Sequence, residues 1–293
     1  MRKRLLLIYN PVAGKAAVTD RLSTIVESFA GTGYDVMAVP IQPGRGAEEI
    51  LKELGGEFRR VVCCGGDGTL NHTINGLMQM KHPPLFGYLP SGSTNDFARS
   101  LGLPARFEDG CVRIAAGKPF YYDIGAFNDR YFNYVAAFGA FTEVSYLTPQ
   151  DEKNALGHLA YLIEGLKRLP IGQHFPAKVE CDGEVFRGDY LYGSVSNSTS
   201  VGGMALGSDE VELDDGKFEL LLIKAPANVA ETSDIAGKLL ARDFSGESVR
   251  LLRGSHIRFV FKEEINWTLD GEFGGALRKA EIRVCPKALG ILR

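Results

Sequence analysis

The sequence has no long apolar run and little excess charge. No stretch of its 293 residues approaches the ~20 consecutive apolar residues that a membrane-spanning helix needs. The basic start leads into LLLIYN, which ends at Asn10-Pro11, and so short a run predicts a strand and not a signal peptide. A net charge of −3 provides no global positive field, so we expect no nucleic-acid partner.

Residues that form disulfides or bind zinc are also sparse. The five cysteines are odd in number and none has CxxC spacing, and the five histidines show no ligand spacing. The sequence therefore favours neither a disulfide framework nor a zinc site, and we expect a cytoplasmic protein with reduced thiols.

Glycine, by contrast, is abundant. The 35 glycines are about 12% of the chain against a usual value of roughly 7%, and they cluster in the first hundred residues and in 202–216 and 271–275. Such clusters indicate loops whose backbone approaches something closely. The length itself predicts two domains, or one large domain with a smaller one embedded in it.

Short apolar runs alternate with helical patterns in the first part of the chain. The expected strands are 4–10, 35–39, 59–64 and 84–89, and the expected helices are 18–30, 47–54, 69–79 and 95–101. Such alternation predicts βαβ units around a parallel sheet that is covered on both faces. We assign residues 1–122 to a Rossmann-like nucleotide-binding α/β domain.

From about residue 118 the pattern changes to strand-like runs separated by turn residues, among them 130–137, 256–262 and 265–271. Two expected helices, 155–169 and 229–242, interrupt these runs. Residues 123–280 are therefore predicted to form a mostly antiparallel β domain, a sandwich or a barrel. Residues 281–293 would be a last strand able to return to the first domain.

Three unusual loops follow strands of the first half: NPVAGK (10–15), GGDGTLN (65–71) and PSGSTNDFA (90–98). Each enters a helix, which makes a phosphate cradle from backbone N–H groups at the carboxyl edge of the sheet. None fits GxxxxGK[ST] or GxGxxG, and each alone could be a plain turn or helix cap. Asp67 and Asp96 follow strands at this edge, and carboxylates beside phosphates imply a cation between them, usually Mg²⁺.

These motifs together resemble the catalytic domain of the diacylglycerol kinase family, which includes bacterial diacylglycerol kinases, YegS-like lipid kinases and sphingosine kinases. GGDG is similar in phosphofructokinases and NAD kinases, but NAD kinases do not follow it with PSGSTNDFARSLG. The resemblance covers nearly the whole chain. It implies an NAD kinase- or phosphofructokinase-like parallel α/β domain followed by an antiparallel β-sandwich domain.

The resemblance also implies roles for residues of the first half. Asp67 would act through Mg²⁺ on the phosphates, with Asp96 and Asp123 extending a catalytic network of acids. Arg45 could supply a phosphate contact in place of a threonine that the family often has near Ile41. The residues implied to bind the nucleotide are Asn10, Pro11, Gly14, Gly65, Gly66, Gly68, Thr69, Leu70, Asn71, His72, Ser93 and Asn95.

Two motifs of the second half match the family as well. VELDDGKFEL (211–220) resembles its structural metal loop, with Asp215 as a side-chain ligand of Mg²⁺ or Ca²⁺ and the backbone carbonyls of Glu212 and Lys217 beside it; Asp-Asp-Gly could equally be a simple hairpin turn. NWTLDGE matches the family's LDGE, in which the glutamate, here Glu272, is the proposed general base. From the residues alone, Glu272 would be one solvated acid after a hairpin turn.

The resemblance implies an ATP-dependent lipid kinase that binds Mg-ATP in the first domain and admits a lipid alcohol, such as diacylglycerol, between the domains. We expect it in the cytoplasm, where peripheral contact with the inner face of the membrane and a homodimer are both compatible with the sequence. The helix at 155–169 could be core or membrane contact. The alternatives are a kinase of a small soluble alcohol or a nucleotide, as NAD kinases are, and a nucleotide- or lipid-binding relative without catalysis.

Overall fold

The computed structural model describes residues 3–14, 17–93, 95–140, 174–197, 200–201, 204–205 and 212–293. It divides into two compact units. Unit 1 comprises Met1–Ile124 and Pro286–Arg293, and unit 2 comprises Gly125–Cys285. Among the residues described, no helix combines the length and the apolar character needed to cross a membrane.

Unit 1 is built on a parallel sheet in the order β4-β3-β1-β2. Leu5, Leu6, Leu7 and Ile8 of the inner strand β1 have no exposed surface, as the continuous apolar run predicted for a sheet covered on both faces. The four strands are β1 (Lys3–Tyr9), β2 (Tyr34–Pro40), β3 (Arg60–Gly65) and β4 (Leu85–Pro90).

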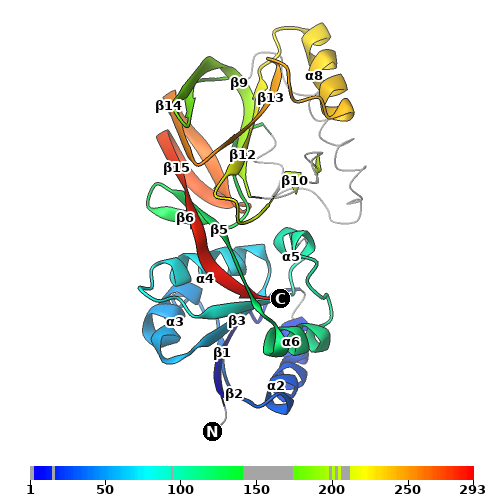
Figure 1. The fold of residues 1–293 in the computed structure, drawn as a ribbon, viewed down its shortest axis with the longest axis vertical. Helices are drawn as coiled ribbons and strands as arrows, with labels where there is room; N and C mark the ends of the chain where they lie inside the picture. Colours follow the sequence, from blue (N-terminus) through cyan, green and yellow to red (C-terminus); the bar gives the residue numbers. More distant parts are fainter. Residues whose placement is uncertain are drawn as a thin grey trace. The chain divides into compact units, whose positions relative to one another are not determined.

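Helices cover both faces of this sheet. Figure 1 shows α2 and α6 on one side of the unit 1 strands and α3 and α4 on the other. Arg21 separates α1 from α2, so the single helix expected at 18–30 is two. The helical elements are α1 (Ala17–Asp20), α2 (Leu22–Gly31), α3 (Ala47–Leu54), the 3-10 turn η1 (Gly55–Glu57), α4 (Asp67–Met78), α5 (Asp96–Ser100) and α6 (Phe107–Ala116).

The end of the chain belongs to unit 1. The last residues of β15 (Glu272–Leu292) run parallel to β4, with Ile291 opposite Phe86. The Asp123 carboxylate accepts a hydrogen bond from the Lys287 N–H at 2.7 Å. These contacts fix the C-terminal residues on the sheet of unit 1.

Unit 2 is mostly antiparallel β structure. The long strands β9 and β14 each pair with β7 and with β8 at different points along their length, so the strands fold into two packed layers. Strand β5 (Pro119–Phe127) leads from unit 1 into unit 2. Together with β15, the elements of unit 2 are β6 (Arg130–Phe132), β7 (Val135–Gly139), β8 (Phe175–Cys181), β9 (Glu184–Ser196), β10 (Ser200–Val201), β11 (Met204–Ala205), β12 (Phe218–Lys224), α8 (Val229–Ala241), β13 (Val249–Gly254) and β14 (His256–Leu269).

Strand β12 is buried on both faces and therefore reads as an almost continuous apolar run. Phe218, Leu220 and Leu222 face a core that includes the fully buried Trp267. Leu221 and Ile223 face the opposite layer, which packs under α8. The alternation follows from the period-2 geometry of a strand.

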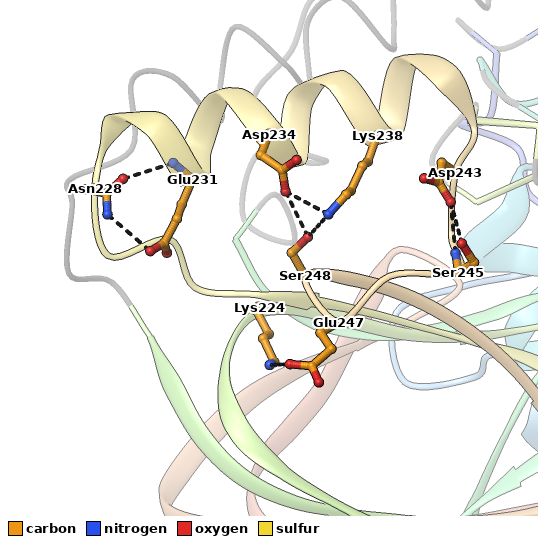
Figure 2. Close-up of polar contacts among 9 residues, drawn as sticks. All are labelled: Lys224, Asn228, Glu231, Asp234, Lys238, Asp243, Ser245, Glu247 and Ser248. Carbon is orange, nitrogen blue, oxygen red and sulfur yellow. Dashed lines mark hydrogen bonds and ion pairs between the residues drawn. The ribbon is translucent and has the colours of Figure 1, made fainter.

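Helix α8 begins with a side-chain cap. The Asn228 Oδ1 accepts a hydrogen bond from the Glu231 N–H at 3.0 Å, and the Glu231 carboxylate accepts one from the Asn228 amide at 3.1 Å (Figure 2). The first bond satisfies a backbone donor that the first turn of a helix leaves open, and the second holds the two side chains together. The helix predicted at 229–242 is confirmed within a residue.

Several element boundaries differ from the expectation. The runs 256–262 and 265–271 form one strand, β14, whose pairing with β15 shifts register between Val260 and Ile265. The run 130–137 is divided into β6 and β7. Helix α6 was not expected from the sequence. The helix expected at 155–169 lies outside the described residues.

Candidate active site

The loops after β1, β3 and β4 meet at one edge of the unit 1 sheet, because these strands are parallel neighbours. The Asn10 N–H donates to the Cys64 carbonyl at 3.0 Å, and the Ser91 N–H donates to the Gly65 carbonyl at 2.9 Å. The first residue after β1 and the first residue after β4 are thus both bonded to the end of β3, which lies between these strands, and this brings the three glycine-rich loops together.

Two of these loops touch backbone to backbone. A Cβ atom at Gly92 would lie 2.5 Å from the Cα of Gly66, and one at Gly65 would lie 2.5 Å from the Cβ of Thr69. Contacts this short do not occur for real Cβ atoms, so the packing requires residues without side chains. Gly66 and Gly92 are therefore explained by the close approach of the two loops, and Gly65 by its contact with Thr69.

Helix α4 begins where these loops meet. Gly66 is its N-cap in an extended conformation, and Asp67 is its first residue. The first N–H groups of a helix have no partner within it and carry the positive end of the helix dipole, which favours a bound anion. The helix thus starts two residues earlier than the expected Thr69, and Asp67 belongs to its first turn.

The two acids of the edge are linked. The Asp96 N–H donates to the Asp67 Oδ2 at 3.3 Å, so one carboxylate sits at the start of the helix that carries the other. Asp67 is partly buried and Asp96 is exposed. The structure therefore brings Asp67 and Asp96 together, although 28 residues of chain separate them.

Tyr88 is a contributor that the sequence analysis missed. Its hydroxyl lies 3.2 Å from the Gly65 carbonyl and 3.3 Å from the Asn95 Oδ1. Burial, followed by the negative charge of Asp67, raises the pKa of Tyr88, so the group stays a neutral O–H. The only indication in the sequence was a tyrosine, with its polar hydroxyl, within an otherwise apolar strand.

Asn95 closes the loop after β4. Its backbone is left-handed, with φ of 52°, a conformation that asparagine tolerates better than most residues. Its Oδ1 accepts from the Gly92 N–H at 2.9 Å and its Nδ2 donates to the Gly92 carbonyl at 2.7 Å. The loop is therefore held in one shape by its own side chain.

Asn10 ties the first loop to α4. Its Nδ2 donates to the Thr69 Oγ1 at 3.3 Å, and its Oδ1 accepts from the Val12 N–H at 3.1 Å. Gly14, with φ of 58°, bends the same loop. Pro11 is partly exposed and Ser93 is exposed on their loops, and Gly68 is partly exposed in the first turn of α4.

Other expected nucleotide-binding residues point elsewhere. Leu70 and Asn71 are 1% exposed, so their side chains lie inside unit 1. The exposed His72 places its Nδ1 2.9 Å from a carboxylate oxygen of Glu48 on α3. Arg45 is paired with Glu53 at 2.6 Å. The roles implied for these side chains remain predictions.

Asp123 lies on β5 and is fully buried. Its carboxylate accepts the Lys287 N–H, and Lys287 has a left-handed backbone with φ of 48°. This contact gives Asp123 a clear part in holding the returning strand β15. Its expected place in the acid network remains a prediction.

Glu272 follows a tight hairpin turn in unit 2. Asp270 and Gly271 have φ of 52° and 88°, and Leu269 is paired with Glu272 across the turn. The buried Asp270 carboxylate accepts three backbone N–H groups, from Asn133 at 2.7 Å, Tyr134 at 2.9 Å and Val135 at 3.0 Å. Glu272 is therefore an exposed carboxylate on a rigidly anchored turn.

In the predicted metal loop, Asp215 is paired with the side chain of Arg253. One Asp215 oxygen accepts the Lys217 N–H at 2.9 Å, and the other is bonded to the Arg253 guanidinium. The Arg253 Nε also lies 3.3 Å from the buried Glu219, its cross-strand partner. A guanidinium thus neutralises the carboxylate that a metal would need, so these side chains as arranged do not fit a metal on Asp215. The assignment of Glu212, Asp215 and Lys217 stays a prediction.

The carboxylates at the edge of the unit 1 sheet are the other candidate ligands of Mg²⁺. Among the described residues, no three His, Cys, Asp or Glu side chains cluster closely enough to hold a metal ion by themselves. Kinase Mg²⁺ is usually held by one or two carboxylates together with substrate phosphates. The linked Asp67 and Asp96 fit such a shared site.

Residues 4–127 match the diacylglycerol kinase catalytic domain, and residues 137–293 match the YegS C-terminal NAD kinase beta sandwich-like domain. The chain is 33% identical over 280 residues to a diacylglycerol kinase of Bacillus subtilis, covering 94% of this chain and 91% of that protein. It is 32% identical over 283 residues to a diacylglycerol kinase of Staphylococcus carnosus, with the same coverage.

A crystal structure of a diacylglycerol kinase from Bacillus anthracis is similar in fold. The TM-score is 0.79 at 23% identity, over 99% of this chain and 97% of that one. The matches confirm the predicted fold class, a parallel α/β domain followed by a β-sandwich domain like that of NAD kinases.

Proposed function

The chain belongs to the diacylglycerol kinase family, as its loops suggested, and on that premise we propose that it transfers the γ-phosphoryl group of Mg-ATP to the hydroxyl of a lipid such as diacylglycerol. Kinases of this family use ATP. An identity of 33% supports this family-level chemistry, and the particular lipid is our proposal. The observation that carries it is the glycine-packed edge that places Asp67 and Asp96 at the start of two helices.

The loops of unit 1 would bind the phosphates of ATP. The start of α4 supplies backbone N–H groups and a positive dipole end, and the Gly66–Gly92 contact lets the backbone come close to a ligand. Asn10 and Asn95 hold two of the loops in shape. Because the donors are fixed before the reaction, they can stabilise the charge that develops on the transferring group.

Asp67 and Asp96 would hold the cation that accompanies ATP. A bound Mg²⁺ supplies charge neutralisation on the phosphate oxygens. Asp67 and Asp96 would contribute carboxylate oxygens as ligands. The hydrogen bond from the Asp96 N–H to the Asp67 carboxylate helps to keep the two residues at a fixed spacing.

Glu272 would accept the proton of the lipid hydroxyl. An alcohol is a poor nucleophile until its proton has an acceptor within hydrogen-bond reach. The anchored turn at Asp270 holds Glu272 in place while its carboxylate stays exposed to a substrate. We expect the enzyme to act from the cytoplasm on lipids at the membrane surface.

The test is product analysis with γ-labelled ATP. The purified protein is incubated with diacylglycerol in mixed micelles and, separately, with NAD, and the products are separated by chromatography. Labelled phosphatidic acid is the expected product. Labelled NADP would assign the chain to a nucleotide kinase, and ATP binding without any labelled product would assign it to a relative without catalysis.

A panel of other lipid alcohols extends the same experiment. Phosphatidylglycerol, a sphingoid base and a polyprenol each present a hydroxyl beside an apolar chain. Faster labelling of one of these than of diacylglycerol would keep the lipid kinase and replace the proposed substrate.

A further inference from the structure

A cavity of about 280 Å³ opens in unit 2 where β9, β12 and β13 come together. The core-facing side of β12 is apolar as far as Leu222, and Lys224 continues it at the end of the strand. In the strand register Leu222 lies opposite Arg250, and Lys224 lies opposite Tyr190 at a bulge. The apolar layer therefore ends at a positively charged opening of the cavity, formed by Lys224 and Arg250 and called the mouth below.

The charges that line the cavity are unbalanced. Arg187, Lys224 and Arg250 contribute three cations, and Glu247 is the one acid among the described residues that line it. Two positive charges are thus left over in a concave site. The walls beside them are the aromatic rings of Phe186 and Tyr190.

The mouth is arranged to receive an anion. Lys224 Nζ lies 3.1 Å from the Glu247 carboxylate (Figure 2), but the two side chains are 41% and 81% exposed, so water screens the pair and a better anion can replace the acid. The Arg250 guanidinium carbon lies 4.9 Å from the centre of the Phe186 ring, a contact that holds the cation at the cavity wall.

Neighbouring contacts keep this mouth in shape. The Lys238 ammonium is bonded to Asp234 at 2.8 Å and to the Ser248 hydroxyl at 2.8 Å, so it is committed to the segment that begins β13 (Figure 2). The Lys224 N–H donates to the Ser248 carbonyl at 2.9 Å. Lys224 and Glu247 are therefore held at a defined separation by backbone and side-chain bonds.

We propose that this cavity binds the phosphate monoester headgroup of a lipid. A phosphate monoester carries a charge of about −1.5 to −2 at neutral pH, which matches the two unbalanced cations. Guanidinium groups bind phosphate oxygens in pairs, and the aromatic walls suit the carbon atoms next to the ester. The volume is near the lower limit of ligand pockets, roughly 300 Å³, so it takes a headgroup and leaves acyl chains outside.

A phosphorylated lipid is the product class of the proposed kinase, so the cavity would hold the enzyme on membranes that already contain product. That link alone rests on the proposed function. The binding itself is measured without ATP and without turnover, so failure of the cavity and failure of the kinase assignment give different results.

The experiment is sedimentation of the full chain with phosphatidylcholine vesicles that contain phosphatidic acid. The double variant K224M/R250M should bind at least tenfold more weakly, since each lost charge-assisted contact is worth about a factor of ten. The control K262M/R278M removes the same charge from exposed residues of β14 and β15 outside the cavity and should bind like the wild type. The charge-preserving K224R keeps the Arg250 guanidinium and should retain binding, which shows that the cavity tolerates substitution.

Equal loss in K262M/R278M, or equal binding of vesicles that contain the phosphodiester phosphatidylglycerol, would overturn the proposal in favour of general surface charge. Glycerol 3-phosphate distinguishes the source of the ligand. Tight binding of it assigns the cavity to soluble monoesters, binding of vesicles alone assigns it to a lipid headgroup, and binding of neither removes the site.

Discussion

The substitution Gly92→Ala tests the packing at the centre of the candidate active site. The new Cβ would meet the Gly66 Cα at 2.5 Å and the Asn95 Oδ1 at 2.9 Å. The first of these is a backbone atom, which cannot rotate away, so the two loops must separate. The second contact displaces the acceptor that the Gly92 N–H uses.

The expected cost follows from these two contacts. Overpacking a close contact costs typically 1–3 kcal/mol, and weakening a partly buried hydrogen bond adds about 1 kcal/mol. We expect unit 1 to lose about 2–4 kcal/mol of unfolding free energy, which lowers its melting temperature by several degrees. ATP affinity should fall as well, because the separated loops no longer present their N–H groups together.

The matched control is Gly31→Ala, whose Cβ would meet nothing within 4 Å and whose backbone needs no left-handed conformation. This variant should melt at the wild-type temperature or slightly above it, since alanine restricts the unfolded chain. Thermal melting and ATP titration of both variants are the measurements. Wild-type stability and wild-type ATP affinity in Gly92→Ala would refute the packing explanation of these glycines.

Three further predictions concern unit 2. Glu272→Gln should lower kcat about 10²- to 10⁴-fold in a lipid phosphorylation assay while the melting temperature stays the same, because the side chain is exposed; retained turnover would exclude it as the base. Asp270→Asn should cost about 2–3 kcal/mol in chemical denaturation, because an amide cannot accept all three N–H groups that the buried carboxylate now accepts; an unchanged midpoint would contradict the anchoring role. Burial raises the pKa of Glu219 to about 7 from 4.5 despite the nearby Arg253, so the folded state binds this proton more tightly than the unfolded state. The stabilisation is then present below pH 4.5 and is lost as pH rises through about 7. Melting curves of Glu219→Gln should therefore gain on the wild type between pH 5 and pH 8, and a constant difference between the two proteins would contradict the raised pKa.

The parallel sheet of unit 1 could be read from the sequence because β1, β3 and β4 are buried on both faces and their apolar runs are continuous. Helix α6 could not, since Gly110 and several charges interrupt its pattern. In the structure Gly110 is needed for close packing, because a Cβ there would lie 2.6 Å from Leu89. A residue that is a helix breaker locally is a packing requirement in the folded chain.

The loops of the candidate site could be predicted from the sequence, but the hydrogen bonds and ion pairs between its distant residues could not. GGDG and PSGST indicate loops at one sheet edge, and the strand order brings them together. The bond from Asp96 to Asp67 and the three bonds to Asp270 join residues far apart in the chain, so no local pattern carries them. The same holds for Arg253, which reaches Asp215 only because β13 pairs with β12.

The central claim is that the edge around Asp67 serves phosphoryl transfer to a lipid hydroxyl. Its most direct test is the initial rate of phosphatidic acid formation from diacylglycerol and ATP, for the wild type and for Asp67→Ala at equal protein concentration, with melting temperatures measured alongside. We predict product from the wild type and none above background from the variant, with the fold retained. Equal rates from the two proteins would contradict this function for the site.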